Sequence, residues 1–173
     1  MISLDQLLAS RDARAALQQK MLAENPGCSI VCLTVQLPGP VKRNATSLAI
    51  GKAGADALRA RFPHALLTER DLPTGYEAYL PLPMPPRDAK RITCELEETH
   101  PLGRLMDIDV VGAEGPVSRA DIGLAPRRCL LCGNEVRYCM RAKSHTREEL
   151  LSKIEEIVSK YIYGIQKTDP RRD

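Results

Sequence analysis

The stretch from His100 to Val111 constrains the fold of this chain most, because it sets two carboxylates inside an apolar run. Asp107 and Asp109 are two residues apart, and residues two apart on a β-strand point to the same face. Both carboxylates are therefore expected to project from one face of a strand whose other face enters the core. The apolar neighbours are Leu105, Met106, Ile108, Val110 and Val111.

Two adjacent carboxylates indicate a bound cation, because they repel each other and resist ionisation without one. Magnesium is the simplest candidate among the ions that prefer oxygen ligands. Gly103 and Arg104 precede the strand; glycine lets backbone approach a ligand closely, and a guanidinium group suits phosphate. The pattern favours phosphoryl or nucleotidyl transfer, although a solvated strand face produces the same Asp-x-Asp spacing.

For two other residues near this strand, the sequence allows a functional and a structural interpretation. His100 either deprotonates an attacking hydroxyl or hydrogen-bonds loop backbone, and the second is favoured. Lys42 follows Pro38-Gly39-Pro40 and is either a phosphate contact or a solvated charge at the start of a helix. The sequence does not choose a third metal ligand; the candidates are Asp121, Glu95 and Glu97.

Hydrophobic spacing and capping residues predict an α/β domain with a mixed sheet flanked by helices. Expected helices cover residues 4–24, 44–62 and 88–99 and follow Thr146, while strands cover 28–37, 64–70, 75–82 and the Asp-x-Asp run. Residues 88–99 also alternate like a strand, but Asp88 as a cap and Pro101 as a stop favour helix. A strand over 116–121 is expected to return beside the carboxylates and bring Arg119 or Asp121 to them. Pro81, Pro83, Pro85 and Pro86 predict an extended linker.

Composition narrows the class of protein. The chain has 173 residues, which suits a single domain, and with 43% hydrophobic residues, no Trp and one Phe its core must be aliphatic. A net charge of +3 gives no argument for nucleic-acid binding. No apolar run is long enough to span a membrane and the N-terminus lacks a signal-peptide pattern. We therefore expect a cytoplasmic protein with its six cysteines reduced or metal-bound.

The segment 127–145 is basic and carries a candidate zinc site. Its spacing Cys129-x2-Cys132-x6-Cys139-x5-His145 resembles a zinc knuckle, with packing cysteines as the alternative. The basic residues between 127 and 147, set against the single acid Glu135, suit a polyanionic ligand or an acidic protein. They are Arg127, Arg128, Arg137, Arg141, Lys143 and Arg147. After a capping box at Thr146, residues 150–161 form an amphipathic helix, and 167–173 form a frayed tail.

Several motifs together resemble the apo-citrate lyase phosphoribosyl-dephospho-CoA transferase family over most of the chain. The longest is His100-Pro-Leu-Gly-Arg-Leu-x-Asp-Ile-Asp-Val. The others are Pro126-Arg-Arg-Cys-Leu-x-Cys132, Cys139-x-Arg141-x-Lys143-x-His145, Pro38-Gly-Pro-x-Lys42 and Leu7-Leu-x-Ser-Arg-Asp12. The resemblance implies one transferase domain over 1–173 with a nucleotidyltransferase-like helix–loop–strand unit.

The resemblance also implies a reaction. The 2′-(5″-triphosphoribosyl)-3′-dephospho-CoA group would pass to a serine of the apo acyl carrier protein of citrate lyase, with release of diphosphate. Asp107 and Asp109 would hold magnesium and Arg104 would neutralise the leaving group, while Arg127, Arg128 and Arg141 would contact phosphates or the carrier. The alternatives are the analogous transfer for malonate decarboxylase and a non-catalytic, zinc-containing assembly factor that binds the carrier.

Overall fold

The computed structural model describes residues 2–35 and 37–168, and these form two compact units that divide between Pro126 and Arg127. The expected single domain over 1–173 stays a prediction for the whole chain. In order, the elements are α1 (Leu4–Glu24), β1 (Ser29–Val35), α2 (Ala45–Arg61), β2 (Thr68–Leu72), β3 (Gly75–Leu82), α3 (Pro86–Thr99), η1 (Gly103–Leu105), β4 (Asp107–Gly112), β5 (Gly115–Val117), η2 (Ala120–Ile122), α4 (Val136–Ala142) and α5 (Arg147–Thr168).

The first unit is an α/β layer structure around a five-stranded sheet in the order β2-β3-β1-β4-β5. The α/β class and the flanking helices are confirmed. All four strand pairings are antiparallel, whereas a mixed sheet was expected. Central β1 is buried along its whole length, as its apolar β-branched sequence predicts.

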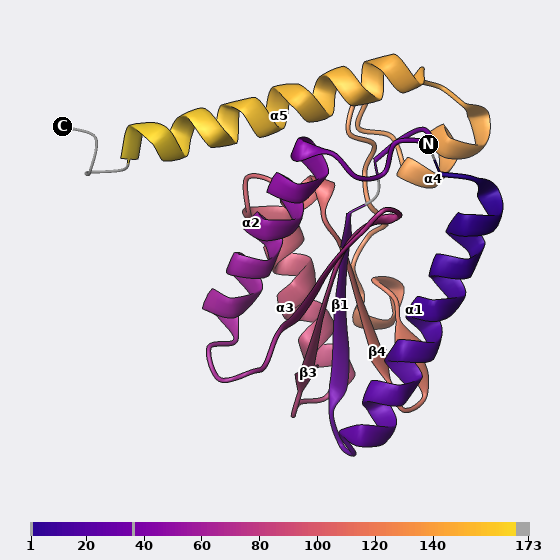
Figure 1. Ribbon diagram of the computed structural model, residues 1–173, viewed down its shortest axis with the longest axis vertical. Coiled ribbons are helices and arrows are strands. Elements are labelled where there is room, and N and C mark those ends of the chain that lie inside the picture. The colour runs from indigo at the N-terminus through magenta and orange to yellow at the C-terminus, as the bar shows by residue number, and fades with distance from the viewer. Residues whose placement is uncertain (1, 36, 169–173) are drawn as a thin grey trace. The chain divides into compact units, whose positions relative to one another are not determined.

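Alternation along the strands separates the two faces of the sheet. Leu33 faces α2, where a Cβ added to Gly54 would lie 2.8 Å from Leu33 Cδ2. Its neighbour Thr34 must then point the opposite way, toward the side that α1 covers. Figure 1 shows α1 on one side of the strands and α2 and α3 on the other.

Local signals in the sequence set most helix boundaries. The hydroxyl of Ser3 accepts a hydrogen bond from the backbone N–H of Gln6 at 3.2 Å and begins α1. Asn44 caps α2 in the same way, through Ser47 at 2.9 Å. In the second unit Thr146 and Glu149 form the expected capping box at the start of α5. The amphipathic stripe of α5 includes Ile154 and Val158, which are buried.

The structure differs locally from the sequence predictions at several points, and two predictions fall on residues that it does not describe. Residues 88–99 are helical, but α3 begins at Pro86 with Pro85 as N-cap, so Asp88 is not the cap. The strand expected over 75–82 is confirmed as β3 and contains Pro81, beyond the residues that pair with β2. The expected proline linker is correspondingly short, because Pro85 caps α3 and Pro86 begins it. The short helix α4 was not predicted. Gln36 of the expected strand 28–37 and residues 169–173 of the expected tail lie outside the described residues.

Candidate functional site

The paired carboxylates lie on β4 as their spacing predicts. Asp107 and Asp109 are exposed, whereas Ile108 and Val110 between and after them are buried. Both carboxylates therefore project from the same face of the sheet, and this is the face that α1 covers.

Strand register extends this face into two rows of side chains. Asp107 is paired with Thr34, and Asp109 with Cys32, across β1. The same β1 residues are paired with Glu77 and Tyr79 of β3 on their other side. Because directly paired residues share a face, the face carries Asp107, Thr34, Glu77 and Arg70 in one row and Asp109, Cys32, Tyr79 and Thr68 in the next.

The backbone between the two carboxylates is held by charged side chains of α3. Lys90 Nζ donates to the carbonyl oxygen of Ile108 at 2.8 Å, and Glu97 Oε1 accepts from the Ile108 N–H at 2.9 Å. Lys90 and Glu97 are both buried. They occupy the hydrogen-bonding positions that a neighbouring strand would fill, because β5 pairs only with residues 110–112 of β4. Side chains from α3 thus fix the backbone that carries the Asp pair.

Among the described residues, none of the three candidates for a third metal ligand joins the Asp pair in a cluster of metal-ligating groups. Glu97 is bound to Ile108 N–H and to Arg119 Nη1 at 3.3 Å. Asp121 accepts from the backbone N–H of Ser118 at 2.7 Å and from its hydroxyl, and these bonds lower its carboxyl pKa. Glu95 is exposed on α3. The returning strand was predicted over 116–121, but β5 ends at Val117, so Arg119 and Asp121 lie beyond it.

Lys42, Gly103 and Arg104 of the predicted phosphate site differ in their local surroundings. Lys42 Nζ donates to the carbonyl of Leu37 at 2.6 Å, and partial burial lowers its pKa. At Gly103, an added Cβ would lie 2.5 Å from the carbonyl oxygen of Glu97, so the last turn of α3 requires the glycine. Arg104 is exposed in η1, three residues before Asp107.

His100 hydrogen-bonds backbone, as the favoured reading of the sequence predicts. Its Nδ1 accepts the N–H of Leu102 at 3.0 Å, and burial lowers its pKa. A neutral histidine that accepts at Nδ1 carries its proton on Nε2. In this tautomer Nε2 is a hydrogen-bond donor, and the role of His100 as a general base stays a prediction.

Sequence reasoning missed the polar residues opposite the Asp pair. Glu77 is only 3% exposed, and its carboxylate binds Arg14 of α1 at 3.1 Å and the Tyr79 hydroxyl at 2.6 Å. Burial raises the pKa of the Cys32 thiol to about 12, with Arg14 lowering it and Asp109 and Glu77 raising it. All three charges therefore act on one point of this face. The available signal was Glu77, a lone acid in an apolar β3.

In the second unit, the four predicted zinc ligands converge. The ligand atoms of Cys129, Cys132, Cys139 and His145 all lie within 4.8 Å of one another. Cys132 Sγ is 3.4 Å from Cys139 Sγ and 3.3 Å from His145 Nε2. In a tetrahedral site with bonds of about 2.3 Å, ligand atoms lie about 3.8 Å apart. The cluster can hold a metal ion with little rearrangement.

The turn that carries the first two cysteines has the form of a zinc knuckle. Gly133, directly after Cys132, has a φ of 72°, a conformation that favours glycine. Burial raises the pKa of Cys129, but hydrogen bonds from the backbone N–H groups of Leu131 and Cys132 outweigh it and bring this pKa to about 7. Cys139 goes the other way, since burial and its cysteine neighbours raise its pKa to about 11.

The basic residues of this unit surround the cluster in sequence and are largely exposed. Arg127 is half-buried and Arg128 exposed before the knuckle, while Arg137 and Arg141 are exposed on α4. Tyr138 and Met140 of α4 are exposed hydrophobic side chains, at 64% and 73%. The helix therefore presents cationic and apolar groups together.

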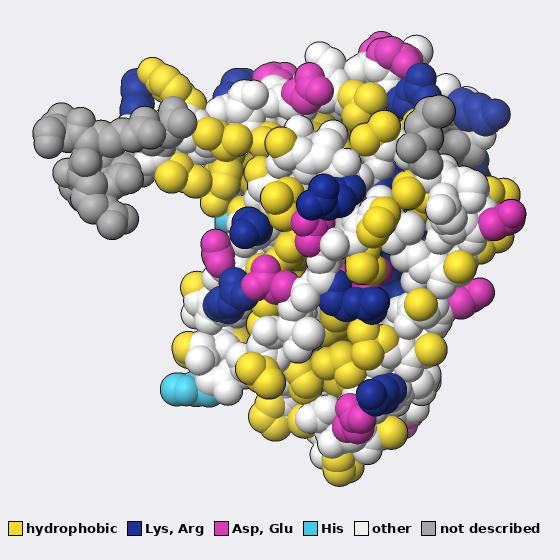
Figure 2. All heavy atoms as spheres, in the orientation of Figure 1, with side chains coloured by type: hydrophobic (Ala, Val, Ile, Leu, Met, Phe, Trp, Pro, Cys, Tyr) yellow, Lys and Arg dark blue, Asp and Glu magenta, His cyan; other side chains and the backbone are white. Residues whose placement is uncertain are grey.

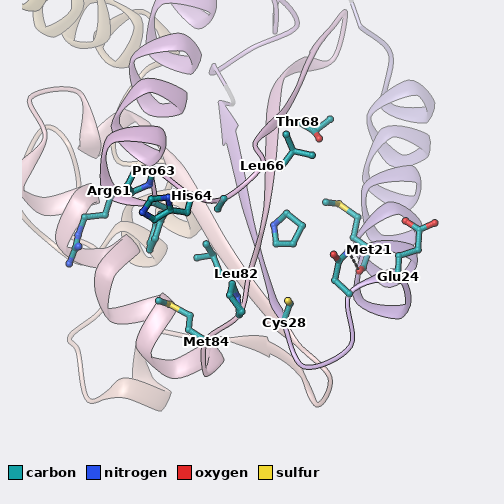
Figure 3. Close-up of a pocket in the computed structure, with 15 residues that line it drawn as sticks. Met21, Glu24, Cys28, Arg61, Pro63, His64, Leu66, Thr68, Leu82 and Met84 are labelled. Atoms are coloured by element: carbon teal, nitrogen blue, oxygen red, sulfur yellow. Dashed lines mark hydrogen bonds between the residues drawn. The ribbon is translucent and has the colours of Figure 1, made fainter.

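A separate cavity of about 650 Å³ opens at the edge of the sheet in the first unit (Figure 3). Met21 of α1, Leu66 and Leu82 contribute to its lining, beyond the point where β2 stops pairing with β3. Figure 2 shows hydrophobic side chains gathered in the lower part of this view. None of the predicted site residues lines this cavity.

Fold and side chains thus describe an α/β protein with a paired-carboxylate face and a separate Cys/His unit, and comparison with known proteins gives its family. The family described as apo-citrate lyase phosphoribosyl-dephospho-CoA transferase matches residues 2–161. The chain belongs to this family of transferases.

Curated relatives agree. An Escherichia coli O1:K1 protein named apo-citrate lyase phosphoribosyl-dephospho-CoA transferase is 40% identical over 168 residues, covering 91% of this chain and 89% of that protein. A Shigella boydii protein of the same name is also 40% identical, with the same coverage. Protein CitXG of Haemophilus influenzae is 38% identical over 169 residues, but this chain spans only 36% of its length. No helix among the described residues is long and apolar enough to cross a membrane.

Proposed function

We propose that this protein transfers the 2′-(5″-triphosphoribosyl)-3′-dephospho-CoA group to a serine of the apo acyl carrier protein of citrate lyase and releases diphosphate in the cytoplasm. Family membership supports the transferred group and the citrate lyase context. The observation that carries the chemistry is the pair Asp107 and Asp109, exposed on one face of a strand whose backbone is fixed by Lys90 and Glu97.

The proposed reaction is a substitution at phosphorus. The serine oxygen forms a bond to the α-phosphorus of the triphosphate, and the bond from this phosphorus to the bridging oxygen breaks. Diphosphate leaves with the electron pair, and the serine proton passes to solvent or a base. Asp107 and Asp109 would hold a magnesium ion, which when bound supplies positive charge to the phosphate oxygens.

The residues of the chain have two further roles in this proposal. Arg104, exposed three residues before Asp107, would neutralise charge that develops on the leaving diphosphate. Gly103 and Lys42 have local partners and would act mainly by shaping the loops beside the site. The exposed basic residues Arg128 and Arg141, with Arg127, would receive the acidic carrier protein or remaining phosphates.

A diphosphate-release assay tests the proposal. Purified protein, donor, magnesium and the apo carrier of citrate lyase should give one diphosphate and one modified serine per carrier. The apo carrier of malonate decarboxylase, tested in parallel, should react at least tenfold more slowly. Absence of diphosphate with both carriers, while the protein still binds the citrate lyase carrier, would leave the non-catalytic assembly role.

The carrier surface has its own test. Reversal of Arg137 and Arg141 to Glu should raise the KM for the carrier more than that for the donor, and added salt should reduce the difference, because exposed charges are screened. Reversal of Lys52 and Arg61, exposed on α2 in the other unit, is the matched control. A larger rise in the KM for the donor would assign Arg137 and Arg141 to phosphate binding.

We also propose that Cys129, Cys132, Cys139 and His145 hold one structural zinc ion. The set of four protein ligands leaves no open position for water, which is typical of a structural site. Protein purified without an affinity tag should contain about one zinc per chain. Cys132→Ser should lose the metal and lower the melting temperature, whereas Cys28→Ser, outside the cluster, should keep both. A zinc-free protein whose melting is unchanged by chelator would make these cysteines ordinary packing residues.

A further inference from the structure

Helix α1 meets the sheet through polar as well as apolar side chains, since its half-buried residues also include Leu7, Leu17 and Met21. Ser10, Arg14 and Gln18 follow one another at four-residue spacing and are all half-buried, while none of the residues of α1 is fully buried. Ser10 is bonded to Thr74 at 2.8 Å, and Arg14 to Glu77 at 3.1 Å. A helix that served only to cover a sheet would need no charged side chain among its half-buried residues, so the position of Arg14 indicates a further role.

Glu77 holds Arg14 in place on the face that carries the Asp pair. Its Oε1 accepts from Arg14 Nε at 3.1 Å and its Oε2 from the Tyr79 hydroxyl at 2.6 Å. Glu77 is 3% exposed, and a buried carboxylate needs such partners to stay ionised. With these bonds made, Glu77 acts as an anchor for the guanidinium group.

The rest of the Arg14 guanidinium is available to a ligand. Its side chain is 19% exposed. Within the part of the chain that the structure describes, Nε has the Glu77 partner and the two terminal amines have no hydrogen-bond partner. A guanidinium group offers five N–H donors in a planar fork that matches phosphate oxygens.

A second group on the same face lacks a partner. Thr34 is 2% exposed, and its Oγ1 has no hydrogen-bond partner among the described residues. Strand pairing sets Thr34 between Asp107 on β4 and Glu77 on β3. Ser29 Oγ, on the opposite face, also has no partner among the described residues. Buried hydroxyls are almost always hydrogen-bonded, and Thr34 is the one of the two that lies in the same row as Asp107 and Glu77, where it can donate to a ligand.

We propose that Arg14 is a phosphate-binding residue for the donor, that Glu77 and Tyr79 are its positioning residues, and that Thr34 donates a hydrogen bond to the same ligand. This inference rests on the proposed function. The backbones of Asp107 and Glu77 lie about 10 Å apart, since each strand step is about 4.8 Å. An extended triphosphate attached to ribose spans this interval, with its reacting phosphorus at the Asp pair and further anionic oxygens at Arg14.

Inorganic tripolyphosphate with magnesium is a suitable probe, because its binding does not require transfer. In calorimetric titration, Arg14→Gln should weaken its binding at least tenfold, and Arg14→Lys should recover part of the loss. Arg11→Gln, an exposed arginine on the same helix, is the matched control and should bind as the unaltered protein does. In the transfer assay, Arg14→Gln should raise the KM for the donor at least fivefold and that for the carrier less than twofold.

A double variant separates binding from folding. Arg14→Gln removes the nearer cation from the buried Glu77 carboxylate and leaves it only Arg70 Nη1, at 3.8 Å, whereas Arg14→Gln with Glu77→Gln leaves a neutral, hydrogen-bonding pair. If the folded double variant binds tripolyphosphate as well as the unaltered protein, or if the unaltered protein binds none, the inference about Arg14 is wrong. An equal rise in both KM values would also overturn it. Absence of diphosphate release by the unaltered protein, with Arg14-dependent tripolyphosphate binding intact, would instead overturn the proposed function alone.

Discussion

The two faces of the central sheet differ in what they bury. On the α2 face, Leu33 and Ile108 are fully buried, and Gly51 and Gly54 let the helix approach closely. On the α1 face, the same strands present carboxylates, a hydroxyl and a thiol to a helix with a polar stripe. Alternate residues of β1 and β4 thus serve packing on one side and the candidate site on the other.

This difference shows how one sheet supports both tasks. Close packing on the α2 face supplies stability, so the α1 face can hold polar groups such as Thr34, whose Oγ1 has no hydrogen-bond partner among the described residues. Variants on the two faces should therefore separate stability from activity.

The largest expected effect is on the α1 face. Asp107→Asn or Asp109→Asn should reduce transfer at least 100-fold, about 2.7 kcal/mol of transition-state stabilisation, because the cation site is lost. The free energy of unfolding should change by less than about 1 kcal/mol, since both side chains are exposed. Glu114→Gln, an exposed acid in the same hairpin, is the control for a steady-state assay and a denaturant titration. More than about a tenth of the activity in either variant would argue against the metal role.

On the α2 face we expect the opposite result, a clear loss of stability with little change in transfer activity. In Gly51→Ala the new methyl group would lie 2.3 Å from Tyr76 Cγ, and this overpacking should lower the free energy of unfolding by about 2 kcal/mol in spite of alanine's higher helix propensity. Transfer per folded molecule should stay close to that of the unaltered protein. Gly164→Ala serves as control, because an added Cβ there meets nothing within 4 Å. Equal stability of the two variants would show that α2 does not approach the sheet so closely.

A smaller effect, on both stability and transfer, is expected from Lys90, which holds the strand between the two carboxylates. Lys90→Met removes the hydrogen bond to the Ile108 carbonyl and leaves that buried acceptor unsatisfied, which should cost about 1 kcal/mol of stability. Transfer should fall several-fold as well, because the strand between Asp107 and Asp109 is less well fixed. Lys52→Met, at an exposed lysine of α2, should change neither quantity. Unchanged transfer at full stability would mean that β4 is held without Lys90.

The smallest expected effect concerns His100 and pH. Burial lowers its pKa in the folded protein, so as pH falls below the unfolded value of about 6.5 the unfolded chain binds a proton that the folded protein resists. This contribution destabilises the protein on acidification toward the folded pKa and is absent above neutrality. Denaturant titrations at several pH values should show a weaker acid dependence for His100→Gln. The variant should keep most of its transfer activity, and a 100-fold loss would support His100 as a general base.

Much of the fold was predictable because it depends on local signals. The two-residue spacing of Asp107 and Asp109 determined their shared face, since side chains on any strand alternate. Ser3, Asn44 and Thr146 marked helix starts because capping bonds span only three residues. The zinc-ligand prediction likewise followed from short spacings, and the cysteine and histidine atoms do converge.

Other features could be decided only by the tertiary structure. Arg14 and Glu77 are 63 residues apart in sequence, and Lys90 binds a carbonyl 18 residues away. Nothing in the local sequence distinguishes Arg14 from its exposed neighbour Arg11. Nor does the local sequence show that Gly103 is needed because it lies against the last turn of α3. The direction of strand pairing and the length of β5 also depend on tertiary contacts, because α3 side chains and β5 both bind the same edge of β4. The sequence by itself determined which side chains share a face of a strand or a helix. The tertiary structure decided which residues from different elements are in contact, because a contact between distant residues depends on every element that brings them together.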